Sequence, residues 1–103
     1  MAVTTTLRDG IAVITFDNPP VNGLGLDVRR GLAEALDAAN ADPAVQGIVL
    51  TAAGKFFSGG ADIKEFNTPR AVQAPNLHDL IAAVEASARP VCVAINGTAL
   101  GGG

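Results

Sequence analysis

The stretch Phe56-Phe57-Ser58-Gly59-Gly60-Ala61-Asp62-Ile63-Lys64-Glu65-Phe66 decides how this chain folds, because its two glycines join an apolar run to a charged turn. Residues 46–51 precede it with the continuous apolar pattern of a strand covered on both sides. Residues 62–66 follow with the charged pattern of a short helix. A glycine pair lets a ligand approach backbone N–H groups closely, since no side chain fills the space. The stretch therefore predicts a binding loop at the end of a strand.

A second glycine-rich stretch, Asn96-Gly97-Thr98-Ala99-Leu100-Gly101-Gly102-Gly103, follows the apolar run at residues 91–95. It does not fit the dinucleotide fingerprint, because Ala99 stands where a glycine is needed, or the Walker pattern, because Gly103 stands where a lysine is needed. Alone, the first stretch would indicate only a tight turn between core phenylalanines. Two such loops can direct two N–H donors at one oxygen, which is what an oxyanion hole requires.

Together the two stretches resemble the signature segments of the crotonase (enoyl-CoA hydratase/isomerase) superfamily, and residues 17–24 resemble its first loop. The likeness covers the whole chain and is greatest to the N-terminal hydratase/isomerase part of bifunctional β-oxidation enzymes. It implies an α/β fold in which β-β-α turns wind into a superhelix. Residues 1–103 are then expected to be the N-terminal part of one crotonase-like domain, truncated at the glycine triple.

The resemblance assigns the catalytic groups of this portion to the backbone N–H groups of Ala61 and Gly102, as the two oxyanion donors. It also implies a set of residues that lie against an acyl-CoA substrate: Val21, Asn22, Gly60, Asp62, Ile63, Lys64 and Gly101. Of these, Asp62, Ile63 and Lys64 would line the adenine and phosphate end, where a lysine suits the phosphate charges. A plain Pro/Gly connector for the first loop and a solvated surface lysine at position 64 are the alternatives.

The function implied is that of an acyl-CoA enzyme of fatty-acid β-oxidation that hydrates enoyl-CoA, with Δ3,Δ2-isomerase activity left open. In the family a catalytic glutamate lies just beyond the position of Gly103 and a second lies further on. Glu65 and Glu85 are interpreted as ordinary helix-surface carboxylates. We therefore expect a fragment of a longer enzyme that is inactive by itself. The alternative is a non-catalytic module of the same fold that binds CoA esters or serves assembly.

No cofactor or metal is expected in this portion: the CoA thioester is a substrate, and NAD belongs here only if a dehydrogenase domain follows. The expected partners are an acyl-CoA and the rest of the parent chain, with a homo-oligomer left open. A net charge of −3, without Trp, Tyr or a basic stripe, argues against nucleic-acid binding. No apolar run approaches the roughly 20 residues of a membrane helix, and the first residues do not have the basic-then-apolar pattern of a signal sequence. A cytoplasmic location is expected.

Along the chain, Asp9-Gly10 between the β-rich residues 4–8 and 11–16 predicts a hairpin with a two-residue loop. Residues 27–40 have apolar side chains at helical spacing, and a second helical run begins at Asn76. With the apolar run at residues 46–51, these segments establish a β-α-β alternation. Their order along the chain therefore favours an α/β fold.

Several side chains have an ordinary structural interpretation. Arg29 belongs to the charged residues of the first helix, which are taken as its solvated face. His78 is expected at the helix edge or surface, without a catalytic role. Cys92 lies in an apolar run and is expected to be a reduced thiol in the core. Residues 67–75 form a Pro-bracketed linker, expected to be mobile and to cover the acyl pocket.

Overall fold

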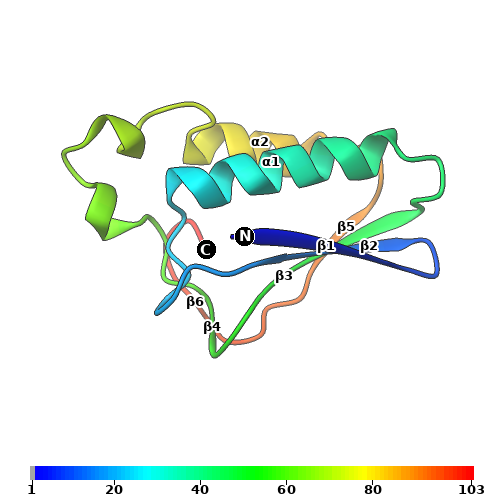
Figure 1. Cartoon of the computed structure of the whole chain (residues 1–103), viewed down its shortest axis with the longest axis horizontal. Coiled ribbons are helices and arrows are strands. Elements are labelled where there is room, and N and C mark those ends of the chain that lie inside the picture. Colours follow the sequence, from blue (N-terminus) through cyan, green and yellow to red (C-terminus); the bar gives the residue numbers. More distant parts are fainter. Residues whose placement is uncertain (1) are drawn as a thin grey trace.

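Two successive β-β-α units and the first two strands of a third make up the fold, as the sequence predicts (Figure 1). The computed structural model describes residues 2–103. In chain order the elements are β1 (Val3–Arg8), β2 (Ile11–Phe16), α1 (Leu26–Ala41), β3 (Gly47–Ala52), β4 (Phe56–Ser58), the short 3-10 helices η1 (Ile63–Glu65) and η2 (Pro69–Ala71), α2 (Leu77–Glu85), β5 (Val91–Val93) and β6 (Thr98–Ala99).

The main sheet has the strand order β1-β2-β3-β5. β1 and β2 form the predicted antiparallel hairpin, and Asp9 and Gly10 have the positive φ angles, 52° and 82°, that its two-residue loop requires. β3 pairs with β2 and β5 in parallel, so each crossover places a helix on the sheet. The carboxyl ends of β2 and β3 therefore lie at the same edge, where the loops leave for the candidate site.

Both helices cover one face of the main sheet (Figure 1). Ile14 and Phe16 of β2 are at most 1% exposed and belong to the core with Leu32 of α1. On the opposite face of β3, Val49 and Thr51 are only half-buried. The expectation that residues 46–51 are covered on both sides is therefore wrong, because within residues 2–103 both helices pack on the same side.

The apolar run at residues 91–95 and the expected core position of Cys92 predict a buried strand, but β5 is not buried. Val93 is 40% exposed and Cys92 is exposed, so the thiol is not a core group. β5 pairs with β3 along one edge only, and no other strand of the described chain pairs with it. An apolar composition did not determine burial here, because burial depends on which elements lie opposite the strand.

A second, two-stranded sheet joins the ends of the two glycine-rich stretches. β4 pairs in parallel with β6, so Phe56 lies opposite Thr98 and Ser58 opposite Ala99. The Leu100 N–H continues this pairing by donating to the Ser58 carbonyl at 2.9 Å. At Gly97 the two backbones come so close that a Cβ would overlap the carbonyl oxygen of Lys55.

Replacing Gly97 with alanine is therefore expected to push β6 away from β4 and to lower the free energy of unfolding by roughly 1 to 3 kcal/mol. Denaturant unfolding of the protein that carries this chain measures the change. Gly47→Ala is the matched control, since its Cβ would meet the movable end of the Ile11 side chain at 3.3 Å and the Pro90 carbonyl oxygen at an ordinary contact distance of 3.8 Å. Equal losses for the two variants would contradict the close approach at Gly97.

Candidate active site

The two glycine-rich loops meet at Gly60 and Gly102, as the sequence predicts. A Cβ on Gly60 would lie 3.0 Å from the Leu100 carbonyl oxygen and 3.7 Å from the Gly102 nitrogen. Gly60 also has a φ of 99°, which L side chains rarely adopt. The glycine at position 60 thus allows both loops to contribute to one site.

The two expected donors are backbone amides that have no protein acceptor in the described chain. Within residues 2–103, neither the Ala61 nor the Gly102 N–H donates to a protein acceptor. Beside them, Gly60 donates to the Ser58 hydroxyl at 3.1 Å and Gly103 donates to the Leu100 carbonyl at 2.8 Å. Ala61 and Gly102 are both exposed, so their free N–H groups on adjoining loops are accessible to an oxygen atom of a ligand.

The direction of the Ala61 N–H is set by the peptide group to which it belongs. The carbonyl of that peptide, Gly60 C=O, accepts a hydrogen bond from the Leu24 N–H at 2.8 Å. In a trans peptide the N–H points away from the C=O. The Ala61 N–H is therefore held facing away from Leu24.

An apolar cavity of about 260 Å³ opens beside Gly102. Phe16 and Phe57 line it from the strands, and their rings pack edge to face with centroids 5.4 Å apart. Leu80 and other apolar residues of α2 form another wall, and Glu85 at the end of α2 also borders the cavity. The linker 67–75, which is expected to cover an acyl pocket, does not line this cavity.

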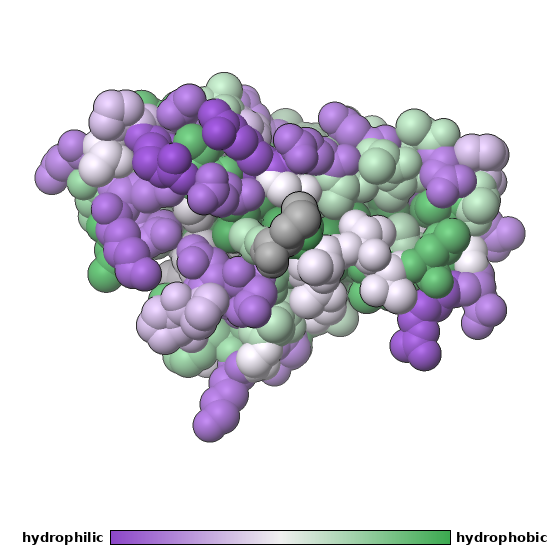
Figure 2. Space-filling model, viewed as in Figure 1, coloured by the Kyte–Doolittle hydropathy of each residue, from purple (hydrophilic) through white to green (hydrophobic). Residues whose placement is uncertain are grey.

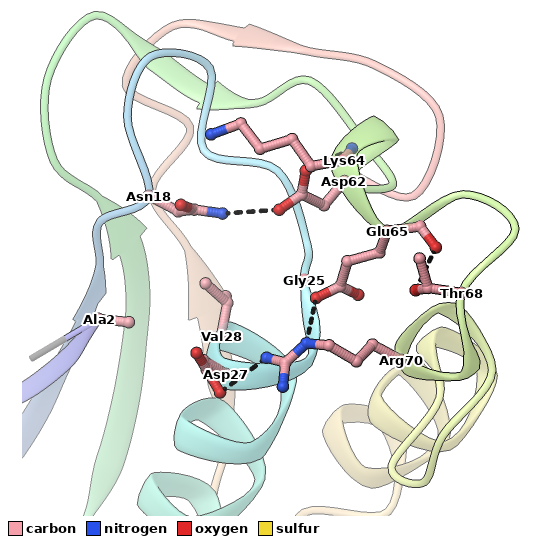
Figure 3. A pocket seen from close by; sticks show the side chains of 10 residues that line it. All are labelled: Ala2, Asn18, Gly25, Asp27, Val28, Asp62, Lys64, Glu65, Thr68 and Arg70. Atoms are coloured by element: carbon pink, nitrogen blue, oxygen red, sulfur yellow. Dashed lines mark hydrogen bonds and ion pairs between the residues drawn. The ribbon is translucent and has the colours of Figure 1, made fainter.

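A smaller cavity of about 190 Å³ lies between the first loop and the loop after β4. Val21 lines one side, and Ala61, Ile63 and Lys64 line the other. Asp62 also borders it, but its carboxylate accepts from the Lys64 N–H at 3.0 Å and from the Asn18 amide at 3.3 Å (Figure 3). The structure therefore brings these predicted substrate-binding residues together around one cavity. Gly101 lies exposed beside Gly102 in the other loop.

Asn22 does not face a cavity, in contrast to its expected role against the substrate. It is 2% exposed, and its side-chain amide donates to the carbonyls of Ala53 and Phe56, both at 2.8 Å. Its side-chain oxygen accepts from the Asn18 N–H. Asn22 therefore braces the first loop against the turn between β3 and β4, and its side chain is not available to a ligand.

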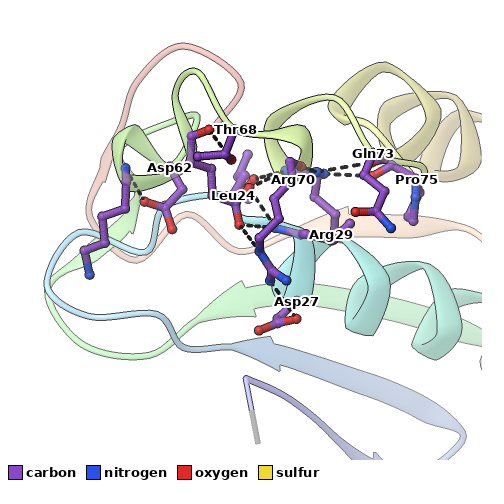
Figure 4. Close-up of polar contacts among 12 residues, drawn as sticks. Leu24, Asp27, Arg29, Asp62, Thr68, Arg70, Gln73 and Pro75 are labelled. Atoms are coloured by element: carbon purple, nitrogen blue, oxygen red, sulfur yellow. Dashed lines mark hydrogen bonds and ion pairs between the residues drawn. The ribbon is translucent and has the colours of Figure 1, made fainter.

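The interpretation of Arg29 and Glu65 as solvated charges is wrong. Arg29 is 3% exposed and Glu65 is 9% exposed, and they form an ion pair of 3.4 Å. The Arg29 guanidinium also donates to the backbone carbonyls of the neighbouring segments (Figure 4). A sequence signal existed for Arg29: it lies three residues before Leu32 and seven before Leu36, on the apolar side of α1.

Arg70 completes this cluster at the surface. It contacts Asp27 at 3.0 Å and Glu65 at 3.3 Å (Figure 3). The hydrogen bonds that the Arg70 guanidinium donates, first to Asp27 and then to Glu65 in order of effect, raise the pKa of Arg70 above its ordinary value. The hydrophilic side chains over this end of the molecule are visible in Figure 2. They border a polar cavity of about 380 Å³ that also contacts Lys64.

His78 lies exposed on α2, as expected, and does not line the cavities beside Ala61 or Gly102. We expect His78→Ala to leave turnover of an acyl-CoA substrate nearly unchanged, because the side chain touches neither candidate donor loop. Steady-state rates of the variant and the parent protein provide the measurement. Loss of turnover with intact substrate binding would assign His78 a chemical role.

Comparison with known families identifies the family in which these two loops occur. Residues 6–103 match the family described as Enoyl-CoA hydratase/isomerase. The chain belongs to the enoyl-CoA hydratase/isomerase family. Both glycine-rich loops and most of the first hairpin lie within the matched residues.

Individual relatives agree with the family. The chain is 42% identical over 103 residues to the peroxisomal bifunctional enzyme of Danio rerio, spanning all of this chain and 14% of that protein. It is 36% identical over 107 residues to a probable enoyl-CoA hydratase of Bacillus subtilis, spanning 99% of this chain and 42% of that protein. The structure of Pseudomonas aeruginosa DspI superposes with a TM-score of 0.88 at 31% identity, covering 99% of this chain and 41% of that one. The chain thus spans well under half the length of these relatives.

The expected cytoplasmic location gains no support from the relatives, since the Danio rerio protein is named as peroxisomal. Among residues 2–103, no helix is both long enough and apolar enough to span a membrane.

Proposed function

We propose that the protein carrying this chain hydrates 2-enoyl-CoA thioesters, with the Ala61 and Gly102 N–H groups as its oxyanion hole. The observation that carries the proposal is the pair of unpaired amides on adjoining loops, one of them bordering an apolar cavity. The thioester oxygen would accept from both amides, and the acyl chain would occupy the cavity between the strands and α2.

In the proposed reaction, the oxygen of water bonds to the β-carbon while a proton is added at the α-carbon. As the carbon–oxygen bond forms, negative charge develops on the thioester oxygen, and the two amides stabilise this enolate. Apolar side chains such as Phe57 and Leu80 keep bulk water from the acyl chain and strengthen the two hydrogen bonds.

The groups that move protons are proposed to lie outside residues 1–103. Glu65 is unsuited to this task because its carboxylate accepts from the Leu26 N–H and contacts both Arg29 and Arg70. The resemblance supports glutamates elsewhere in the protein, and the relatives are longer than this chain. No cofactor is proposed for this portion, and NAD would enter only with a dehydrogenase domain.

The CoA moiety is proposed to follow the smaller cavity lined by Val21, Ile63 and Lys64. Lys64 forms no ion pair within the described chain, so its ammonium group is available to a phosphate. A role in fatty-acid β-oxidation is suggested by the name of a multifunctional relative from Cucumis sativus. A peroxisomal location is suggested by the name of the Danio rerio relative and an additional Δ3,Δ2-isomerase activity by the family description, and all three belong to the same proposal.

The test is steady-state hydration of a short 2-enoyl-CoA by the full-length protein, followed by loss of the absorbance of the conjugated thioester. We expect turnover that depends on the 2,3-double bond. Tight binding of the thioester without turnover would overturn the hydratase assignment in favour of a non-catalytic CoA-ester-binding module. Conversion of a 3-enoyl-CoA to the conjugated isomer tests the isomerase activity separately.

A further inference from the structure

Arg29 and Glu65 are the two buried charges that the proposed chemistry does not use. Arg29 donates to four backbone carbonyls besides contacting Glu65 (Figure 4). Its acceptors are Leu24 at 2.8 Å, Arg70 at 2.7 Å, Gln73 at 3.3 Å and Pro75 at 2.7 Å. One guanidinium thereby joins α1 to the segment before it and to the segment after η1.

The first of these contacts leads directly to the Ala61 donor. Arg29 holds the Leu24 carbonyl, and the Leu24 N–H holds the Gly60 carbonyl at 2.8 Å. Because that carbonyl and the Ala61 N–H belong to one rigid peptide plane, displacement of Leu24 would rotate the donor. The path from the Arg29 side chain to the Ala61 N–H therefore consists of two hydrogen bonds and the intervening covalent structure.

Glu65 holds the segment that follows the Ala61 donor in the sequence. It lies four residues after Ala61 in the sequence, and its two oxygens accept from the Leu26 N–H at 3.0 and 3.2 Å, at the first residue of α1. A carboxylate is favourable at a helix N-terminus because of the helix dipole. At Gly25 a Cβ would come within 2.9 Å of an Asp62 carboxylate oxygen and 3.0 Å of a Glu65 carboxylate oxygen. The absence of a side chain at position 25 thus lets the loop that starts at Ala61 approach α1.

We propose that Arg29 and Glu65 are positioning residues that aim the Ala61 N–H at the thioester oxygen. This inference rests on the proposed function of the Ala61 donor. A buried ion pair is a weak source of stability compared with apolar residues of similar size. The guanidinium of Arg29 is planar, so its N–H groups bind carbonyls from separate segments at fixed angles. A lysine ammonium group does not reproduce this geometry. The pair therefore holds the loop in one orientation rather than merely filling space.

Arg29→Lys and Glu65→Gln in the full-length protein test the proposal. Each keeps a polar side chain of similar length but loses part of the clamp. We expect kcat for a short 2-enoyl-CoA to fall roughly tenfold to a hundredfold, as for a small misplacement of a catalytic group. KM should change by less than about threefold, since the acyl cavity and Lys64 remain intact. The pH dependence of kcat should keep its shape, because neither residue exchanges protons in the reaction.

Arg89→Lys is the matched control. Arg89 is a part-buried arginine that donates to the carbonyls of Val45 at 2.6 Å and Asp42 at 3.3 Å. Its contacts lie beyond the C-terminal end of α1, away from Ala61. The control should lose stability comparably and keep kcat. An equal fall in kcat for Arg89→Lys and Arg29→Lys would indicate that both substitutions act by making the fold less rigid in general. That result would overturn the proposal.

A spectroscopic measurement separates this inference from the function on which it rests. Bound butanoyl-CoA, labelled with ¹³C at the thioester carbonyl, cannot be hydrated and reports hydrogen bonding through its infrared carbonyl frequency. We expect a downward shift in the parent protein and a smaller shift in both variants at saturating ligand. A full shift in the variants, with the parent shifted, would overturn the positioning role alone. An unshifted carbonyl in the parent would overturn the proposed oxyanion hole and this inference with it.

Discussion

Replacing Arg29 with leucine is expected to lower the free energy of unfolding by about 3 to 5 kcal/mol, as when one partner of a buried ion pair is removed. The side chain of Arg29 is 4% exposed and that of Glu65 is 11% exposed, so little water can replace the lost contact. Leucine would also leave the carbonyls of Leu24 and Pro75 without this donor. The loss of the ion pair and the loss of these hydrogen bonds would therefore both lower the free energy of unfolding.

Equilibrium denaturant unfolding of the full-length protein measures this loss. Arg30→Leu is the matched control, since Arg30 is the next residue of α1, is exposed and forms no ion pair in the described part of the chain. That substitution should change stability by no more than about 0.5 kcal/mol. A double replacement of Arg29 and Glu65 by leucine should recover part of the loss, because the single Arg29 variant leaves the buried Glu65 carboxylate with only the half-exposed Arg70 as an ion-pair partner in the described chain. Equal effects of the two single variants would refute the buried role of Arg29.

Local sequence signals predicted the backbone of the site. Asp9-Gly10 predicts the hairpin loop because the positive φ angles there are intrinsic to such residues. Asn76 predicts the start of α2, where it forms a capping box with Asp79. The glycine pair at residues 59–60 predicts a loop whose backbone a ligand can approach, and the structure places the second loop beside Gly60. Each of these features depends on residues that are near one another in sequence or on the absence of a side chain.

The environment of the charged residues could not be predicted in the same way. Glu65 is buried because α1 begins beside it, and this contact joins residues 39 apart. Asn22 is buried because its amide meets two carbonyls of the turn after β3, more than 30 residues away. Cys92 is exposed because it lies opposite Val49, on the face of the main sheet that neither helix covers. Helical or strand periodicity identifies a face, but only the tertiary arrangement determines what lies against it.

Ala61→Pro is expected to lower turnover of a 2-enoyl-CoA by roughly a hundredfold or more, equivalent to about 3 kcal/mol of transition-state stabilisation. Proline removes the Ala61 N–H, which is otherwise unpaired in the described chain, while Gly102 keeps the second donor. The loss should appear mainly in kcat, because the charge on the thioester oxygen develops in the transition state. Steady-state hydration kinetics give this value.

Proline at position 61 also restricts Gly60, whose φ of 99° is unusual, so a distorted loop must be distinguished from a lost donor. Binding of butanoyl-CoA should persist in Ala61→Pro, since the cavity beside α2 and the cavity beside Val21 retain their other walls. Ala61→Gly keeps the N–H and should therefore lose far less turnover than the proline variant. If Ala61→Pro hydrated the substrate normally while binding it normally, the Ala61 amide would not be an oxyanion donor. Loss of turnover in Ala61→Pro, with binding intact and Ala61→Gly active, would instead locate the transition-state contact at this single N–H.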